Sequence, residues 1–367
     1  MRFGIALVIM ATLACRQARE AARDASADVA PDVLVADPWS AVDAAARAAL
    51  ATEGVENAGI VIYDADDVRV FEQMYGDFAP DRRLAVASAS KLVAGVVLFD
   101  LIAKGELSLD ATTGAVLGWT GPGSDITLRH LLSFTSGLAP DAACTIFASR
   151  TLADCVDRIS AAAIVAAPGV QFDYGSTHLH VAARMAEAVR GQDWNAIFRG
   201  VLGDPFGLPR DVLFYTQPRQ ANGTTNPLVA GGLRASMRDY APILALVFHD
   251  GRFADVTVGT PELFAAQATE PFPAAVIVNS PMADAGLPYH YGLGAWLECD
   301  AATVPCPVIS SPGAYGFTPW VDRNNGYYAI VALEDFQLAT GIAAKSVRIS
   351  HAIRAAIVSA LGARASP

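Results

Sequence analysis

Residues 88–104 read SASKLVAGVVLFDLIAK and are followed by Gly105. Their spacing predicts a helix that ends at this glycine. Apolar residues cover nearly all faces of the helix, a pattern typical of a helix buried inside a protein. Ser88 and Lys91, at its start, are three residues apart, so their side chains share one face. The stretch therefore predicts a buried helix with a serine and a lysine in contact.

Such a pair can support nucleophilic catalysis. Burial disfavours the charged form of a lysine and lowers its pKa, so that Lys91 could accept the proton of the Ser88 hydroxyl. The free N–H groups at the start of a helix also suit an oxyanion. In the alternative interpretation, Ser88 caps the helix and Lys91 extends to solvent. The motif alone leaves both interpretations open.

The sequence on either side of this helix predicts a sheet built from both ends of the chain. Strand-like runs occupy residues 59–64, 68–72, 291–298, 314–321 and 327–333, and helices are expected at residues 39–50 and 343–361. The middle, about 106–285, is helical and loop-rich, with helices expected at 127–133, 178–190 and 238–249. We expect an α/β (α+β) domain over residues 38–364: an antiparallel sheet flanked by helices, with an inserted, mainly helical subdomain.

Two further segments carry groups with possible chemistry. Tyr174 lies in a loop ahead of a helix and could pass a proton to a leaving group if a cation stabilised its phenolate. Gly313 allows close approach of the backbone to a ligand, and the Ala314 N–H could donate to an oxyanion. The alternatives are a loop aromatic that packs on the core and a bulge on an edge strand marked by Pro312.

Together these motifs resemble the serine β-lactamase and penicillin-binding-protein superfamily. The resemblance rests on Ser-x-x-Lys at Ser88 and Lys91, Tyr-x-Ser at Tyr174 and Ser176, and a glycine-containing strand near the C-terminus. The segments 105–110, 126–138 and 231–236 look like its β-lactamase-related branch, which is similar to class C enzymes, D-alanyl-D-alanine carboxypeptidases and esterases. The resemblance implies acylation of Ser88, Lys91 as base, proton transfer by Tyr174, and an oxyanion hole of the Ser88 and Ala314 N–H groups.

Two departures from the family pattern bear on the substrate. Ser176 stands where β-lactamases usually carry the asparagine that contacts the substrate amide. Ser311-Pro312-Gly313 stands where they carry Lys-Thr-Gly, or related enzymes His-x-Gly. The missing cation removes a charge-assisted contact worth about 1.5–3 kcal/mol with the carboxylate of a β-lactam or of a peptide ending in D-alanine. The departures favour an ester or amide substrate that lacks this carboxylate.

The N-terminus predicts export. Residues 1–15 contain one arginine followed by an apolar run that is too short to span a bilayer. They end in Thr12-Leu13-Ala14-Cys15, which resembles a bacterial lipobox. We expect Cys15 to be lipidated, with simple cleavage of the signal as the alternative, and residues 16–37 to form a tether. The protein would then be periplasmic or anchored at the outer membrane, in contact with membrane only through this lipid. A net charge of −11 without a basic stripe argues against nucleic-acid partners.

The remaining cysteines are even in number and form two local pairs in sequence, Cys144 with Cys155 and Cys299 with Cys306. In an exported chain we expect two structural disulfides with this local pairing. A zinc site is the alternative, but neither pair has Cys-x-x-Cys spacing, and no histidines flank them. We expect no metal or organic cofactor, and structural roles for His178 and His180.

The sequence therefore predicts an exported, cofactor-free serine hydrolase that acts on a small ester, amide or short peptide through an acyl-enzyme. A D-alanyl-D-alanine carboxypeptidase or a β-lactamase is the alternative among enzymes. A non-catalytic envelope binding protein with the same fold is the alternative from another class. In that protein, Lys91 and Tyr174 would be only packing groups.

Overall fold

The computed structural model describes residues 37–334 and 342–364, and the predicted signal, Cys15 and almost all of the tether lie outside them. A seven-stranded antiparallel sheet has the order β2-β1-β13-β12-β11-β10-β9. Its strands are β1 Asn57–Asp64, β2 Arg69–Tyr75, β9 His290–Tyr291, β10 Trp296–Leu297, β11 Val308–Ser310, β12 Phe317–Asp322 and β13 Tyr327–Glu334. The prediction of a mixed fold with an antiparallel sheet from both chain ends is confirmed.

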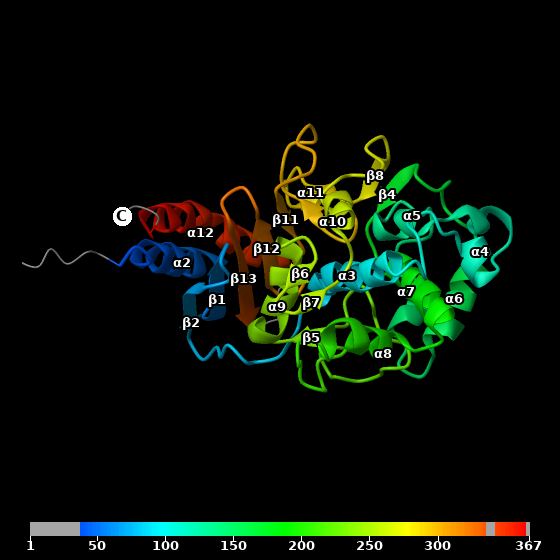
Figure 1. Ribbon diagram of the computed structural model, residues 1–367, viewed down its shortest axis with the longest axis horizontal. Coiled ribbons are helices and arrows are strands. Elements are labelled where there is room, and N and C mark those ends of the chain that lie inside the picture. Colours follow the sequence, from blue (N-terminus) through cyan, green and yellow to red (C-terminus); the bar gives the residue numbers. More distant parts are fainter. Residues whose placement is uncertain (1–36, 335–341, 365–367) are drawn as a thin grey trace, which may run out of the picture.

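One face of the sheet is covered by the two terminal helices. Helices α2 (Ser40–Glu53) and α12 (Ile342–Arg364) contact each other and lie side by side at one end of the molecule (Figure 1). Val42 and Leu50 of α2 and Ile349, Ile353 and Ile357 of α12 pack against buried residues of β1, β12 and β13. Burial of these apolar side chains joins the first and last parts of the chain into one layer.

The other face carries the central helix and the helical part of the chain. Helix α3 (Ser90–Ala103) is buried on all sides over Ser90–Leu101, as the sequence predicts. Around it lie α4 Thr113–Leu117, α5 Leu128–Leu132, α6 Leu152–Ser160, α7 Thr177–Arg190, α8 Trp194–Phe198, α9 Met237–Phe248, α10 Pro261–Gln267 and α11 Pro281–Asp284 (Figure 1). Helix α9 contacts β12 and β13 directly, so this part of the chain also contributes to the covering of the sheet.

Two of the three short strand pairs bring loops to the start of α3. Strand β3 (Leu84–Ala85) pairs with β5 (Arg234–Ala235), and β4 (Gln171–Asp173) pairs in parallel with β8 (Val276–Asn279). The hairpin of β6 (Arg252–Phe253) and β7 (Val256–Thr257) lies after α9. The first two pairs fix the backbone immediately before Ser88 and immediately before Tyr174.

Two strand predictions were wrong in detail. The run predicted as one strand at 291–298 is two strands, β9 and β10, which pair antiparallel across a turn. Gly294 lies at φ +82°, and a Cβ on Gly292 would lie 1.8 Å from the Gln267 oxygen, so two glycines within an apolar run permit this turn. Strand β11 was not expected, and β12 begins at Phe317 because residues 313–316 form a turn in which the Gly316 N–H donates to the Gly313 oxygen over 2.9 Å.

The two predicted disulfides are present, Cys144–Cys155 and Cys299–Cys306. Disulfides persist in oxidising compartments, so the pairing is consistent with an exported protein. Within residues 37–334 and 342–364, no helix combines the length and the apolar character needed to cross a bilayer.

Candidate active site

Ser88 lies in a one-turn 3-10 helix, Ala87–Ala89, immediately before α3. Ala87 adopts φ +47°, a left-handed conformation that costs an alanine roughly 1–2 kcal/mol. The Val86 N–H donates to the Leu233 oxygen over 3.0 Å, and the Tyr240 hydroxyl donates to the Ala89 oxygen over 2.8 Å. The strained turn is therefore held in place from both sides, and within it Ser88 is half-buried while its neighbours are fully buried.

Lys91 contacts Ser88 as the spacing predicts. Its Nζ lies 3.0 Å from the Ser88 Oγ and donates to the Ala230 oxygen over 2.8 Å. The side chain is 4% exposed, so it does not extend to solvent. The N-cap position of α3 is Ala89, and no side chain caps the helix. Both parts of the alternative interpretation, a capping serine and a solvent-exposed lysine, are therefore wrong.

The surroundings of Lys91 favour its neutral form. Burial lowers the pKa of Lys91 to about 7, and the more distant Asp141 carboxylate acts in the opposite direction. At neutral pH a large fraction of the amine is therefore unprotonated and can accept a proton. Sequence reasoning missed both Ala230 and Asp141. The sequence signal beside Ala230 was Gly231-Gly232, two glycines that let this loop pack closely. A Cβ on Gly232 would lie 2.2 Å from the Tyr215 oxygen.

Tyr174 lies against the same lysine. The Lys91 Nζ is 4.5 Å from the centroid of the Tyr174 ring, which stacks on Trp296 at 5.2 Å and meets Phe134 edge-on at 5.1 Å. Burial raises the pKa of Tyr174 to about 12, although hydrogen bonds with Ser88 and Trp296 lower it. The expected phenolate stabilised by a cation is therefore not supported: near neutral pH Tyr174 is a neutral phenol.

The third motif also contacts Ser88. The Ser311 hydroxyl donates to the Ser88 backbone oxygen over 2.9 Å, so this side chain supports the nucleophile's backbone. A Cβ on Gly313 would lie 2.0 Å from the Val86 oxygen, which explains why glycine is needed here. The following residue, Ala314, is exposed, and its N–H has no hydrogen-bond acceptor among the described residues. The motif thus brings the Ala314 N–H close to the Ser88 turn.

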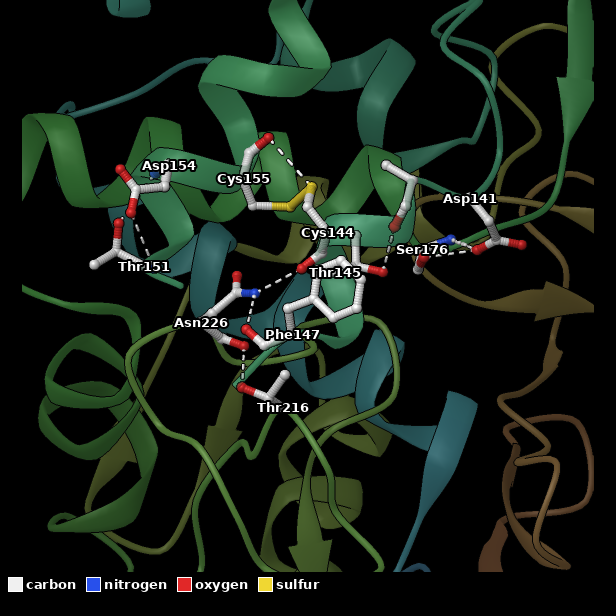
Figure 2. The surroundings of a disulfide bond; sticks show 11 residues. Asp141, Cys144, Thr145, Phe147, Thr151, Asp154, Cys155, Ser176, Thr216 and Asn226 are labelled. Atoms are coloured by element: carbon white, nitrogen blue, oxygen red, sulfur yellow. Dashed lines mark hydrogen bonds between the residues drawn. A yellow bond between two sulfur atoms is a disulfide. The ribbon is translucent and has the colours of Figure 1, made fainter. Parts of the chain in front are cut away.

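Ser176 is held by a carboxylate at the edge of the site. Its Oγ and N–H donate to the Asp141 Oδ1 over 2.6 and 3.0 Å. Figure 2 shows this pair beside the Cys144–Cys155 disulfide, which ties the segment 141–147 to α6. The Asn226 Nδ2 donates to the Cys144 oxygen over 2.9 Å and adds a second support (Figure 2). The disulfide therefore lies close to the site without entering its chemistry.

The two histidines have structural surroundings. Nδ1 of His178 lies 2.8 Å from the Ser136 Oγ, and its Nε2 lies 2.8 Å from the Asp173 backbone oxygen. Burial lowers the pKa of both His178 and His180 to about 4, so both rings are neutral. His178 thus joins the loop after α5 to the loop that carries Tyr174.

An antiparallel sheet closed by terminal helices, with Ser88, Lys91 and Tyr174 together at the start of a buried helix, defines the class of β-lactamase-fold serine hydrolases. The family model described as Beta-lactamase matches residues 42–350, and the chain belongs to this family.

Curated relatives include two kinds of protein. Penicillin-binding protein 4 of Amycolatopsis lactamdurans is 30% identical over 142 residues, 36% of this chain and 36% of the relative. Esterase EstB of Burkholderia gladioli is 29% identical over 154 residues, 36% of this chain and 39% of the relative. The matched region thus spans just over a third of each relative's length.

Solved structures resemble this chain over most of its length. A candidate β-lactamase from Bacteroides dorei has a TM-score of 0.72 at 27% identity, covering 84% of this chain and 97% of that one. Unliganded simvastatin synthase (LovD) from Aspergillus terreus has a TM-score of 0.63 at 18% identity, covering 87% and 98%. The second likeness shows the shared fold alone.

Proposed function

We propose that this protein hydrolyses a small ester through an acyl-enzyme formed on Ser88. The observation that carries the proposal is the 3.0 Å contact between the Ser88 hydroxyl and the buried, partly unprotonated Lys91 amine. Burial of a lysine costs free energy, because the charged amine loses its contact with water. A non-catalytic binding protein has no need for a lysine buried in this way. The family and the relatives named esterase and penicillin-binding protein support hydrolase chemistry.

In the acylation step, Lys91 takes the Ser88 proton as the Oγ attacks the substrate carbonyl. The developing oxyanion accepts hydrogen bonds from the Ser88 and Ala314 N–H groups. Tyr174, a neutral phenol beside Lys91, passes its proton to the leaving alcohol and receives one from Lys91. The carbonyl–oxygen bond to the alcohol then breaks and the acyl group remains on Ser88.

In the deacylation step, a water molecule replaces the departed alcohol. Lys91, again neutral, accepts a proton from this water directly or through Tyr174, and the water oxygen attacks the acyl carbonyl. The Ser88 oxygen leaves and takes the proton back, which restores the starting state.

An ester is favoured over a β-lactam by the residues beside Ser88. Ser311 stands where the family carries a cationic side chain, and its hydroxyl is engaged with the Ser88 oxygen. Ser176 stands at the asparagine position and is engaged with Asp141. Neither residue offers a positive charge to the carboxylate of a β-lactam or of a peptide ending in D-alanine.

Steady-state kinetics on matched substrates test the proposal. We expect hydrolysis of p-nitrophenyl butyrate by the wild type, much slower hydrolysis of nitrocefin and of a peptide ending in D-alanyl-D-alanine, and loss of turnover in Ser88→Ala. Preferred hydrolysis of nitrocefin or the peptide would make a β-lactamase or carboxypeptidase the better assignment. Ester turnover that persists in Ser88→Ala would reject the acyl-enzyme.

We also propose that the protein is exported and attached to a membrane by a lipid on Cys15. The lipobox-like sequence at residues 12–15 and the two disulfides support this location. Mass spectrometry of the N-terminal peptide after expression in a bacterium tests it. A diacylglyceryl group on Cys15 is expected, and Cys15→Ser should release the protein from the membrane fraction.

A further inference from the structure

An arginine contacts the residue that directly follows Ala314, the predicted oxyanion-hole donor. The Arg219 guanidinium carbon is 5.5 Å from the centroid of the Tyr315 ring, and Tyr315 directly follows Ala314. Tyr315 is 38% exposed and Arg219 is exposed. Among the described residues no carboxylate lies within ion-pair distance of Arg219, although most of the described arginines are paired with one. The charge is therefore available to a ligand.

The loop that carries Arg219 is firmly held. Gln217 and Asn222 pair through their backbones, with the Gln217 N–H donating to the Asn222 oxygen over 2.9 Å. The Arg234 Nη1 donates to the Pro218 oxygen over 2.6 Å, immediately before Arg219. The same loop continues to Ala230, whose oxygen binds Lys91. The backbone at Arg219 is therefore held in the loop that leads to Ala230, and the guanidinium contacts Tyr315.

Two residues of opposite charge lie near the catalytic residues. Asp141 binds Ser176, two residues after Tyr174, and raises the pKa of Lys91. Arg219 contacts Tyr315, the residue after Ala314. An anionic substrate group would be repelled by Asp141 and attracted by Arg219.

We propose that Arg219 binds a carboxylate of the substrate, and that the substrate class is the monoesters of dicarboxylic acids. This inference rests on the proposed esterase function. A carbonyl bound at the Ala314 N–H lies one residue, about 3.8 Å along the backbone, from Tyr315. The guanidinium lies 5.5 Å from the Tyr315 ring, so the path from the Ala314 N–H through the Tyr315 side chain limits the separation of the carboxylate and the scissile carbonyl to on the order of 10 Å. An eight-carbon acyl chain with C–C bonds of about 1.5 Å spans roughly this distance.

The test compares mono-p-nitrophenyl suberate with p-nitrophenyl octanoate, two esters of equal chain length that differ by the terminal carboxylate. We expect the wild type to prefer the suberate in kcat/KM by about 5- to 10-fold, with the preference reduced in about 0.5 M NaCl. Arg219→Gln should remove the preference and Arg219→Lys should retain part of it. Arg252→Gln, in the β6–β7 hairpin, is the matched control and should retain the wild-type ratio.

A wild type without preference for the suberate, or an Arg219→Gln variant with the wild-type ratio, would overturn the inference while leaving the esterase intact. Absence of turnover on both esters would instead reject the proposed function itself. The two failures are therefore distinguishable.

Discussion

Lys91 governs the site through its protonation state. Its pKa of about 7 arises from burial, and only the neutral amine can accept the Ser88 proton. We therefore expect kcat/KM for a neutral ester to rise about tenfold per pH unit below pH 7 and to level off above it. Tyr174, with a pKa of about 12, should not contribute a second transition in this range. A rate that falls as pH rises through 7 would contradict the role of Lys91 as base.

Asp141 should tune this transition. Its carboxylate favours the charged form of Lys91, so Asp141→Asn should lower the Lys91 pKa and move the pH–rate transition to lower pH. Ser176→Ala is the matched control, because it removes the hydrogen-bond partner of Asp141 and keeps the carboxylate. Equal shifts in both variants would show that the hydrogen bond, rather than the charge, determines the pKa.

Gly313 should not tolerate a side chain. A Cβ would lie 2.0 Å from the Val86 oxygen, and relief of this contact must separate the 313–314 backbone from the Ser88 turn. Gly313→Ala should therefore lower kcat by about 100-fold, the size of a lost oxyanion donor, and lower the thermal midpoint. Gly362→Ala, in helix α12 where a Cβ meets nothing within 4 Å, is the control; it should leave kcat unchanged and should not lower the thermal midpoint, because alanine favours a helix over glycine. Wild-type kcat in Gly313→Ala would contradict the close approach.

At the scale of residues, spacing in the sequence predicted side-chain contacts within one helix. Contacts between distant segments could be seen only in the structure. The contact of Ser88 with Lys91 follows from helical periodicity. The contacts of Lys91 with Ala230 and of Arg219 with Tyr315 join segments about 140 and 100 residues apart, and no local pattern indicates them. The protonation state of Tyr174 was also inaccessible, because it depends on the aromatic side chains that surround it.

At the scale of elements, periodicity predicted the long helices and the strands of the hairpins. It was wrong where glycines interrupt an apolar run, as in β9 and β10, because the hydrophobic pattern of two short strands is the same as that of one. Strand β11 consists only of Val308–Ser310 and follows the prolines at 305 and 307, so the sequence pattern did not indicate a strand there. The disulfide pairing was predicted because both bridges are local in sequence.

The Cys144–Cys155 bridge should stabilise the segment beside Asp141. It closes a short loop, and loop-closure entropy gives it about 2–3 kcal/mol of unfolding free energy. Replacing both cysteines by serine should lower the denaturant midpoint accordingly, with kcat of the folded enzyme unchanged within about twofold. The same replacement of Cys299 and Cys306 gives a matched comparison at the other disulfide. Complete loss of kcat in folded protein would show that the bridge takes part in the chemistry.

At the scale of the whole molecule, the sheet couples the two ends of the chain to the site. Ile353 of α12 is fully buried against the face of the sheet opposite α3. Ile353→Ala should lower the unfolding free energy by about 2–4 kcal/mol, and fluorescence and circular dichroism should still report one coincident transition. Val358→Ala, at a 39% exposed position of the same helix, should change stability by less than about 0.5 kcal/mol. Separate transitions in Ile353→Ala would show that the helical part folds independently.

The most direct test of the account is the identity of the residue that becomes acylated. The protein, expressed without residues 1–36, is treated with a fluorophosphonate and its intact mass and peptides are measured. The account predicts a single adduct, located on Ser88, that is absent in Ser88→Ala and forms far more slowly in Lys91→Ala. An adduct on another residue, or the same labelling rate without Lys91, would contradict it.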